Sequence, residues 1–209
     1  MSMTDLVIVR HGETDWNLAR RIQGSTDIPL NDTGRAQAAA AAESLAGETW
    51  HAIVTSPLSR ARETARIIAR RLDLGEPQVD DRLVERAYGE AEGLDAAALA
   101  DRFPGMEGVP GIERRSDVTR RVLPALESIA LENPGRRVLI VAHGGVIGSV
   151  VRWVTDKALP GGRTRIPNGS AHRFRYADGL LVLEEFNGLP VEPPIRREAA
   201  IGSALTSSS

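Results

Sequence analysis

Short apolar runs alternate along the chain with longer segments in which apolar residues recur at helical spacing. Four of the runs predict buried strands because they are short and mostly β-branched or aliphatic: Leu6–Val9, Ala52–Thr55, Val138–Ala142 and Leu180–Glu184. A fifth run, His172–Tyr176, alternates aromatic with polar residues and is a further strand candidate. Helices are expected between the strands, so the pattern predicts an α/β fold with a mostly parallel central sheet.

Two helix starts are marked in the first half of the chain. Asn31 can cap a helix that runs through RAQAAAAAESLA and ends at Gly47. Ser56 and Pro57 predict a second start, because serine caps helices and proline suits the first helical position. Behind that start, four residues fall on one apolar face: Ala61, Ala65, Ile68 and Leu72.

The second half of the chain predicts two more helices and a tail. Asp117–Glu132 has helical periodicity with an expected kink at Pro124, and Gly145–Val154 is apolar nearly all round, as in a helix packed on a sheet. The segment Gly93–Ser116 is rich in glycine and proline and predicts a loop or partial lid. We expect one domain over residues 1–189 and a C-terminal tail over residues 190–209, first extended and then polar, with little core.

Composition narrows the class of protein. The chain has 209 residues, 42% hydrophobic and 26% charged, which suits one soluble globular domain. A net charge of -2 predicts no binding to nucleic acid or membranes, and the absence of cysteine excludes disulfides and thiolate catalysis. No apolar stretch approaches the ~18 residues of a spanning helix. The N-terminus has no basic segment before its apolar run, so we expect no signal peptide and a cytoplasmic location.

Two histidines end predicted strands in the same local pattern. Arg10 and His11 follow the first strand, His143 follows a later one, and each histidine precedes a glycine. Ligands of such sheets bind at the carboxyl ends of strands, so one pocket is expected to receive both histidines and two arginines. A lone histidine there would most often be structural, but a repeated pattern favours a site. Zinc is disfavoured, because the HxH and HExxH patterns and cysteine are lacking.

Phosphate chemistry fits this set of residues. Arginines bind phosphate oxygens bidentately and neutralise the charge that repels a nucleophile. A neutral imidazole can attack phosphorus to form phosphohistidine, and a second imidazole, if protonated, stabilises the transferring group. The leaving oxygen then needs a proton from a carboxyl group. Spacing alone leaves Glu85, Glu90 and Glu92 open as the donor.

Five sequence blocks, RHGETDWN, QGSTDIPLNDTGRAQA, SPLSRARETA, LVERAYGEAEG and VAHGG, resemble in this order the histidine phosphatase superfamily, also called the phosphoglycerate mutase-like family. The resemblance covers Leu6–Gly145 and implies a three-layer α/β/α fold. It implies that His11 is the phosphorylated nucleophile and that Glu85 donates and accepts the proton. It also implies that the phosphoryl group is bound by Arg10, Arg62 and His143, and that the substrate side is lined by Asn17, Gln23, Gly24 and Gly144.

Gly12 is expected to let the backbone turn tightly beside a bound phosphate. The family contains both mutases and phosphatases, and its cofactor-dependent mutases carry a long insertion before the second histidine. Here only 57 residues separate Glu85 from His143, which favours the compact phosphatase branch.

Two details are similar to the mutases. ERAYG, with Tyr88, is similar to their ERHYG, and Arg114-Arg115-Ser116 is similar to a segment that mutases use near substrate carboxylates. The alternative for these two arginines is the solvated start of the following helix. Gly111-Ile112-Glu113 stands where many phosphatase relatives have Gly-Glu-Ser. The resemblance therefore assigns no contact to these three residues.

The sequence therefore predicts a metal-independent phosphomonoesterase that acts on a small phosphorylated metabolite through phosphohistidine. The alternative is a phosphoglycerate mutase, for which 2,3-bisphosphoglycerate would be the primer; otherwise no cofactor is expected. A third alternative is a non-catalytic phospho-ligand binder, although such proteins usually lose the nucleophile, an arginine or the acid. Neither nucleic acid nor a membrane is an expected partner, and the sequence leaves a homodimer open.

Overall fold

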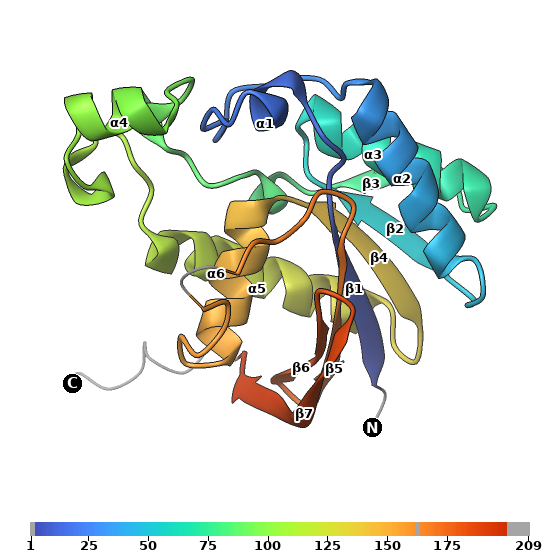
Figure 1. Ribbon diagram of the computed structural model, residues 1–209. Helices are drawn as coiled ribbons and strands as arrows, with labels where there is room; N and C mark the ends of the chain where they lie inside the picture. The colour runs from blue at the N-terminus through green and yellow to red at the C-terminus, as the bar shows by residue number, and fades with distance from the viewer. Residues whose placement is uncertain (1–2, 162–163, 200–209) are drawn as a thin grey trace, which may run out of the picture.

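A single seven-stranded sheet forms the centre of the protein in the computed structural model, which describes residues 3–161 and 164–199 (Figure 1). The strand order is β3-β2-β4-β1-β5-β6-β7. The pairs β3–β2, β2–β4 and β4–β1 are parallel, whereas β1–β5, β5–β6 and β6–β7 are antiparallel. The strands are β1 (Thr4–Arg10), β2 (Ala52–Thr55), β3 (Gln78–Val79), β4 (Arg137–Ala142), β5 (Ala171–Ala177), β6 (Leu180–Phe186) and β7 (Leu189–Glu198).

All five predicted strands are present, but the sheet is mixed rather than mostly parallel, because the consecutive strands β5, β6 and β7 add to it in antiparallel pairs. The two predicted site histidines, His11 and His143, follow strands of the parallel half. The helices are α1 (Asp15–Leu18), α2 (Asp32–Leu45), α3 (Ser59–Arg71), α4 (Ala96–Arg102), α5 (Arg115–Glu132) and α6 (Gly144–Val154). Three short 3-10 helices are η1 (Asp81–Leu83), η2 (Gly89–Ala91) and η3 (Met106–Gly108).

The predicted helix starts have different outcomes. Asn31 caps α2 as expected, since its Oδ1 accepts the Gly34 N–H at 2.8 Å. The next helix, α3, begins at Ser59 rather than at Pro57. Its N-cap residue, Leu58, makes no side-chain cap hydrogen bond, and the first helical N–H, that of Ser59, donates instead to Asp27 Oδ1 at 2.8 Å. The Ser56 hydroxyl instead contacts His143, as described below.

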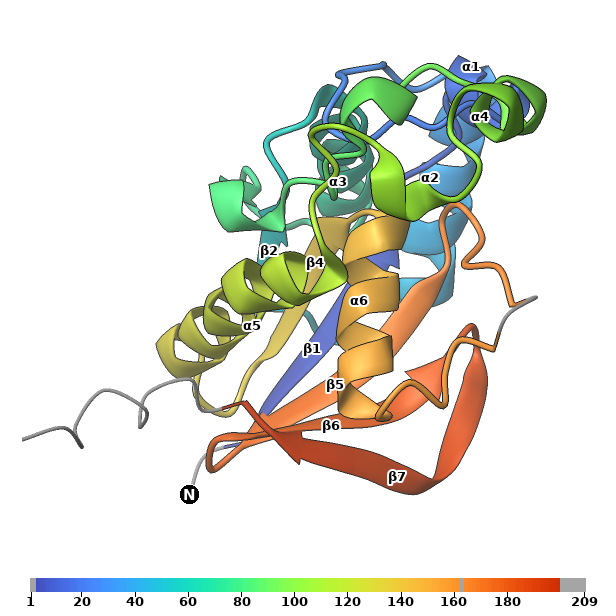
Figure 2. The same ribbon diagram turned by 90° about the vertical axis from the view of Figure 1, so that its left-hand side faces the viewer.

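The strand pleat explains the three layers. Successive side chains of a strand point to opposite faces of the sheet. Leu6 and Ile8 of β1 join the core made with α5 and α6, whereas Val7 and Val9 join the core made with α2 and α3. Figures 1 and 2 show these helix pairs on opposite faces of the sheet. The predicted α/β fold with flanking helices is therefore confirmed.

Two segments are more ordered than their composition indicates. The glycine-rich segment Gly93–Ser116 contains α4 and η3, which its sequence did not predict. The first part of the predicted tail is the edge strand β7, paired with β6 and mostly exposed, while residues 200–209 lie outside the described residues. Within the described ranges, no helix combines the length and apolarity needed to cross a bilayer.

Candidate active site

A cavity of about 800 Å³ lies where β1 ends and α6 begins. Its wall contains seven of the residues predicted from the sequence: Arg10, His11, Asn17, Gln23, Gly24, Glu85 and Gly144. Six arginines line it, and Glu85 is the one acidic residue among the lining residues that the structure describes. The cavity is therefore strongly cationic, as a site for an anion requires.

His11 is buried at the end of β1 and is held in one tautomer. Its backbone N–H donates to Ala142 O of β4 at 3.0 Å, which extends the parallel ladder to the site. Its Nδ1 lies 2.6 Å from Gly12 O, and because a carbonyl only accepts, Nδ1 carries the proton. The lone pair is then on Nε2. Burial, followed by the charges of Arg10 and Arg60, holds the pKa of His11 well below 6.5, so the imidazole is neutral.

His143 lies next to His11, with 5.1 Å between the ring centroids. Its Nε2 is 2.6 Å from Ser56 Oγ, and that oxygen accepts the Leu58 N–H at 3.4 Å. The hydroxyl has one proton and two lone pairs, so it can donate to Nε2 or accept from it. Nδ1 of His143 is a buried atom without a partner in the described structure, and it carries the proton when Ser56 donates to Nε2. Burial, then nearby Arg60, lowers the pKa of His143 well below 6.5. His143 is thus neutral in this structure rather than a protonated imidazole.

Of the two arginines near the start of α3, Arg60 lines the cavity, and Arg62, which was expected there, does not. Arg60 is fully buried and lines the cavity, where its guanidinium donates to Thr26 O at 2.9 Å and Gly24 O at 2.8 Å. Arg62 is exposed on the other side of α3 and lines a separate surface hollow with Arg35.

Helix geometry explains the difference between the two arginines. Residues two apart on a helix point about 200° apart, so Arg60 and Arg62 face opposite sides of α3. Arg60 lies four residues before the buried Thr64, whose hydroxyl donates to Arg60 O at 2.8 Å. The apolar face noted in the sequence starts at Ala61, adjacent to Arg60, and this was the available indication that Arg60 turns inward.

Glu85 is the carboxylate that reaches the cavity, and the structure places the other two candidates elsewhere. Glu90 is exposed and forms an ion pair with Arg102. Glu92 accepts the N–H groups of Ser25 and Thr26, each at 2.9 Å, and so ties down the preceding loop. Hydrogen bonding lowers the pKa of Glu92 despite partial burial, and Glu92 is not among the residues that line the cavity.

The Glu85 carboxylate is seated at the N-terminus of α6. Its Oε2 accepts the Gly145 N–H at 3.0 Å, and its Oε1 accepts the N–H groups of Val146 at 3.1 Å and Arg86 at 2.8 Å. A Cβ at Gly145 would lie 2.5 Å from Oε1, so a side chain there would displace the carboxylate. Gly144 differs, since a Cβ there would lie in ordinary contact, 3.4 Å from Arg10 Nε.

Gly12 has a different role from the one expected. A Cβ at this position would lie 2.2 Å from Gly34 O at the start of α2. The glycine therefore permits the close approach of two backbone segments, and its N–H donates to Thr64 Oγ1 at 3.1 Å. This contact fixes the turn that carries His11.

The remaining predicted residues form one wall of the cavity. Asn17 Oδ1 accepts from Asn168 Nδ2 at 3.2 Å, and Asn168 also donates to His11 O at 3.0 Å. Gln23 is buried and its Oε1 has no partner within the described residues. Gly24 has φ +59°, a backbone conformation that favours glycine. Sequence reasoning missed Asn168, which comes from a loop whose position depends on the tertiary fold.

Arg115 lines the cavity and Arg114 does not. Arg152 of α6 and Arg165 line it as well. Within the described ranges, these three cavity guanidinium groups form no ion pair, and no hydrogen bond from them to another side chain or carbonyl is seen. The pKa of Arg115 is lowered by burial and by the nearby charges of Arg86 and Arg152. Like charges therefore gather here, and Glu85 is the one acidic side chain in the described lining of the cavity.

Comparisons with known proteins agree with this site. A family model described as the histidine phosphatase superfamily (branch 1) matches residues 6–188. "Uncharacterized phosphatase PhoE" of Bacillus subtilis (strain 168) is 38% identical over 88% of this chain and 95% of its own, and "Phosphoglycerate mutase-like protein 4" of Arabidopsis thaliana is 37% identical over 84% and 80%. A solved mycobacterial glucosyl-3-phosphoglycerate phosphatase, in complex with VO3, has a TM-score of 0.76 and 32% identity over 88% of this chain and 98% of its own.

Proposed function

The chain belongs to the histidine phosphatase superfamily, and from this membership and the geometry of its cavity we propose that it hydrolyses phosphomonoesters through phosphohistidine on Nε2 of His11. The observation that carries the proposal is the state of His11: buried, neutral, and with its proton committed to Gly12 O. The imidazole therefore presents a lone pair beside two guanidinium groups. That arrangement suits attack on a phosphoryl group.

The first step forms the P–Nε2 bond and breaks the P–O bond of the ester. Arg10 and Arg60 neutralise the phosphoryl oxygens, and Nδ1–H of His143 donates to one of them. The pair of electrons from the broken bond goes to the leaving oxygen, which takes a proton from Glu85. All of these side chains act while phosphohistidine forms, so loss of any one of them should slow that step.

The second step returns the enzyme to its starting state. A water oxygen attacks phosphorus, the P–N bond breaks, and Glu85 takes the proton that the water loses. Inorganic phosphate leaves, and Nε2 recovers its lone pair. No metal ion has a role in this sequence, because the arginines supply the positive charge that a metal would otherwise provide.

The cavity favours small substrates that carry charge beyond the phosphoryl group. Arg10 and Arg60 lie beside His11, whereas Arg115, Arg152 and Arg165 line the same cavity with no ion-pair partner within the described residues. A carboxylate or second phosphate on the leaving group would meet these guanidinium groups. The solved relative named above acts on glucosyl-3-phosphoglycerate by its name, a molecule of this kind.

Phosphatase is favoured over mutase by the short connection between Glu85 and His143, of 57 residues. In the described part of Gly93–Ser116, the only α-helix before α5 begins at Arg115 is the seven-residue α4. A mutase must keep water from phosphohistidine, and this short segment offers little chain to cover the cavity. The mutase alternative retains support from Arg115, which lines the cavity as the similarity to mutases implied.

One experiment separates these activities. The purified protein is incubated with 3-phosphoglycerate and a trace of 2,3-bisphosphoglycerate in EDTA, and the products are followed by ³¹P NMR. Release of inorganic phosphate is the expected result, and conversion to 2-phosphoglycerate without release would establish a mutase. If 3-phosphoglycerate does not react, p-nitrophenyl phosphate and a panel of phosphorylated metabolites are tested next.

A non-catalytic binder is the remaining alternative. It would bind phosphate esters without becoming phosphorylated, so a rapid acid-free quench followed by intact mass measurement distinguishes it. We expect the added mass of one phosphoryl group, lost in His11→Ala. We also propose a cytoplasmic location and action on free metabolites, without nucleic acid or membrane; light scattering distinguishes a monomer from a homodimer.

A further inference from the structure

Glu85 lies in a segment with little regular structure of its own. Residues 84–87, between η1 and η2, form neither helix nor strand. General acid catalysis requires the proton donor to be within hydrogen-bond reach of the leaving oxygen, so something must hold this segment. The contacts of the carboxylate at the N-terminus of α6 fix the side chain, but the backbone that carries it needs separate support.

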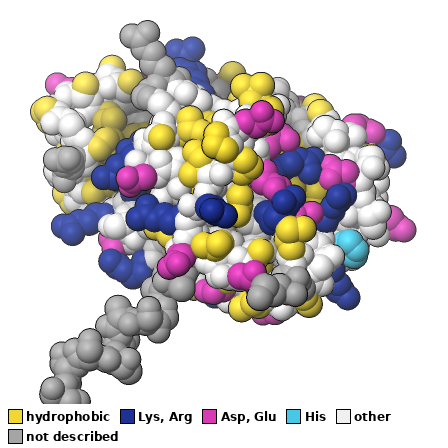
Figure 3. Space-filling model, turned by 90° about the horizontal axis from the view of Figure 1, so that it is seen from below, with side chains coloured by type: hydrophobic (Ala, Val, Ile, Leu, Met, Phe, Trp, Pro, Cys, Tyr) yellow, Lys and Arg dark blue, Asp and Glu magenta, His cyan; other side chains and the backbone are white. Residues whose placement is uncertain are grey.

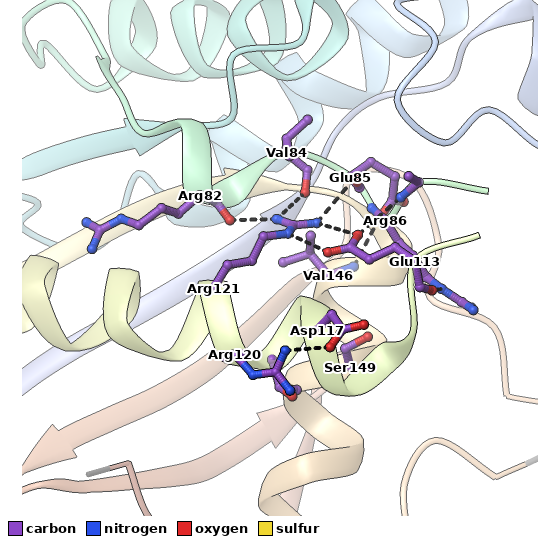
Figure 4. Close-up of polar contacts among 12 residues, drawn as sticks. Arg82, Val84, Glu85, Arg86, Glu113, Asp117, Arg120, Arg121, Val146 and Ser149 are labelled. Carbon is purple, nitrogen blue, oxygen red and sulfur yellow. Dashed lines mark hydrogen bonds and ion pairs between the residues drawn. The ribbon is translucent and has the colours of Figure 1, made fainter. Parts of the chain in front are cut away.

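Arg121 of α5 supplies this support with its guanidinium group. Its Nη1 donates to Arg82 O at 2.6 Å and to Val84 O at 2.8 Å, and its Nη2 donates to Glu85 O at 3.3 Å (Figure 4). One side chain therefore binds two carbonyls of the segment and a third in η1, directly before it. Because α5 packs in the core, this arginine connects the segment to a rigid element.

Glu113 completes the arrangement from the other side. It receives Arg121 Nε at 2.8 Å on Oε1 and Nη2 at 3.0 Å on Oε2, so all five guanidinium donors of Arg121 are used. Glu113 Oε2 also accepts the Ala87 N–H at 3.2 Å, and its backbone N–H donates to Ala87 O at 2.9 Å. Arg86 Nε donates to Glu113 O at 2.7 Å.

From these contacts we propose that Arg121 and Glu113 are positioning residues that set the backbone of residues 82–87 and so aim the Glu85 carboxyl at the leaving oxygen. Neither side chain lines the cavity, so neither is expected to touch the substrate. Their side chains are 22% and 20% exposed, and the bidentate geometry makes the pair specific for arginine. Lysine retains the charge but cannot form the fork.

The proposal rests on the proposed function and predicts a dependence on the leaving group. p-Nitrophenyl phosphate releases a stable anion that needs little help from an acid, whereas glycerol 1-phosphate releases an alkoxide that needs a proton. Arg121→Lys is expected to lower kcat/KM for glycerol 1-phosphate by about 10²-fold, with a change below about threefold for p-nitrophenyl phosphate. The loss is expected in kcat rather than in KM, since phosphate binding is intact.

The matched control is Arg120→Lys. Arg120 is the neighbouring residue on α5, is exposed, and pairs with Asp117 at 2.6 Å without contacting residues 82–87 (Figure 4). It should leave both substrates unaffected. Glu113→Gln keeps an acceptor and the side-chain size, and should produce a smaller loss in the same direction as Arg121→Lys. This second variant tests the proposal if Arg121→Lys does not fold, as judged from thermal melting.

A double-mutant cycle tests whether Arg121 acts through Glu85. Glu85→Gln alone should show the same dependence on the leaving group, and adding Arg121→Lys should then cost little more. Equal losses for both esters, or full additivity in the double variant, would show that Arg121 has a general structural role and would overturn the proposal. Failure of Glu85→Gln itself to discriminate between the esters would instead contradict the proposed function.

Discussion

At the carboxyl end of β1, Arg10 and Arg60 lie in the cavity without an ion-pair partner among the described residues. Away from the cavity, toward the opposite end of the sheet, Arg173 and Arg175 of β5 pair with acidic residues, among them Glu48 at 2.5 Å and Glu184 at 2.8 Å. Figure 3 views the molecule from below and shows basic and acidic side chains intermixed on that face. The same residue type thus stabilises the fold where it is paired and creates a binding site where it is not.

The difference also explains why counting arginines says little about function. All but one of the 26 basic residues are arginine. What distinguishes the cavity is that Arg115, Arg152 and Arg165 form no ion pair within the described residues, and that Glu85 is the one acidic side chain beside six arginines in its described lining. An unneutralised cluster costs folding free energy, and a bound anionic substrate would offset that cost. The following predictions test this contrast, beginning with the largest expected effect.

His11→Ala should abolish turnover, lowering kcat by at least about 10⁴-fold, because the nucleophile is removed. The fold should persist, since His11 borders a cavity rather than the apolar core. His172→Ala, a matched substitution of another buried histidine, should lower Tm. At temperatures below its melting range it should keep the kcat of the unsubstituted protein. Steady-state kinetics and thermal melting measure both. A large loss of Tm in His11→Ala would contradict the assignment.

Arg60→Gln and Arg62→Gln form a matched pair on one helix. Loss of the buried guanidinium should lower kcat/KM by about 10²–10³-fold, whereas loss of the exposed one should change it by less than about twofold. Calorimetric titration with inorganic phosphate should show weaker binding for Arg60→Gln alone. If Arg62→Gln has the larger effect, the contrast between buried and exposed arginines on α3 fails.

Much of the fold was predictable from the sequence because its strands are short apolar runs and its α2 cap is local. Asn31 caps α2 through a neighbouring N–H, so nearby residues suffice to predict it. The start of α3 was missed because its first N–H donates to Asp27, which is distant in sequence. β7 was assigned to the tail because its mostly exposed residues and prolines give no buried pattern.

The site divides in the same way. His11, Arg10 and His143 were placed by strand ends, which are local features. Arg62 was predicted in place of Arg60 because the SPLSRARETA block locates the helix but not its rotation. The rotation of α3 decides which of its two arginines faces the cavity. Asn168 and the support from Arg121 depend on tertiary contacts between segments far apart in sequence.

The stability of the protein should fall as the pH is lowered below the usual histidine range. Burial, then the charge of Arg10, lowers the pKa of His172 from 6.5 to about 4. The unfolded chain therefore binds a proton at this residue between about pH 6.5 and pH 4 that the folded protein does not. Because the pKa of His172 is depressed in the folded protein, its contribution to the free energy of unfolding is complete above pH 6.5. That contribution is lost as the pH falls from about 6.5 to about 4. His11 and His143 act in the same direction.

Urea unfolding should show this loss. His172 alone is expected to remove about 2 kcal/mol between about pH 7 and pH 5, so His172→Gln should reduce the pH-dependent loss by that amount. The substitution can lower stability at every pH, because Nδ1 of His172 accepts the Asn187 N–H at 3.3 Å. The measured quantity is therefore the change with pH and not the absolute free energy. An unchanged pH dependence in the variant would show that His172 titrates normally.

The smallest effect is expected at the opposite end of the sheet, where Arg173→Gln removes the bidentate contact with Glu48. The pair is partly exposed, with 31% and 26% of the two side chains accessible, so solvent screening limits its contribution to about 1 kcal/mol. The hydrogen bond with Arg173 lowers the pKa of Glu48, and this contribution should disappear as acid protonates the carboxylate. Because Arg173 lies far from the cavity, kcat should not change. A loss of activity at unchanged Tm would mean that the two ends of the sheet are coupled, and the division between paired and unpaired arginines would no longer separate structure from function.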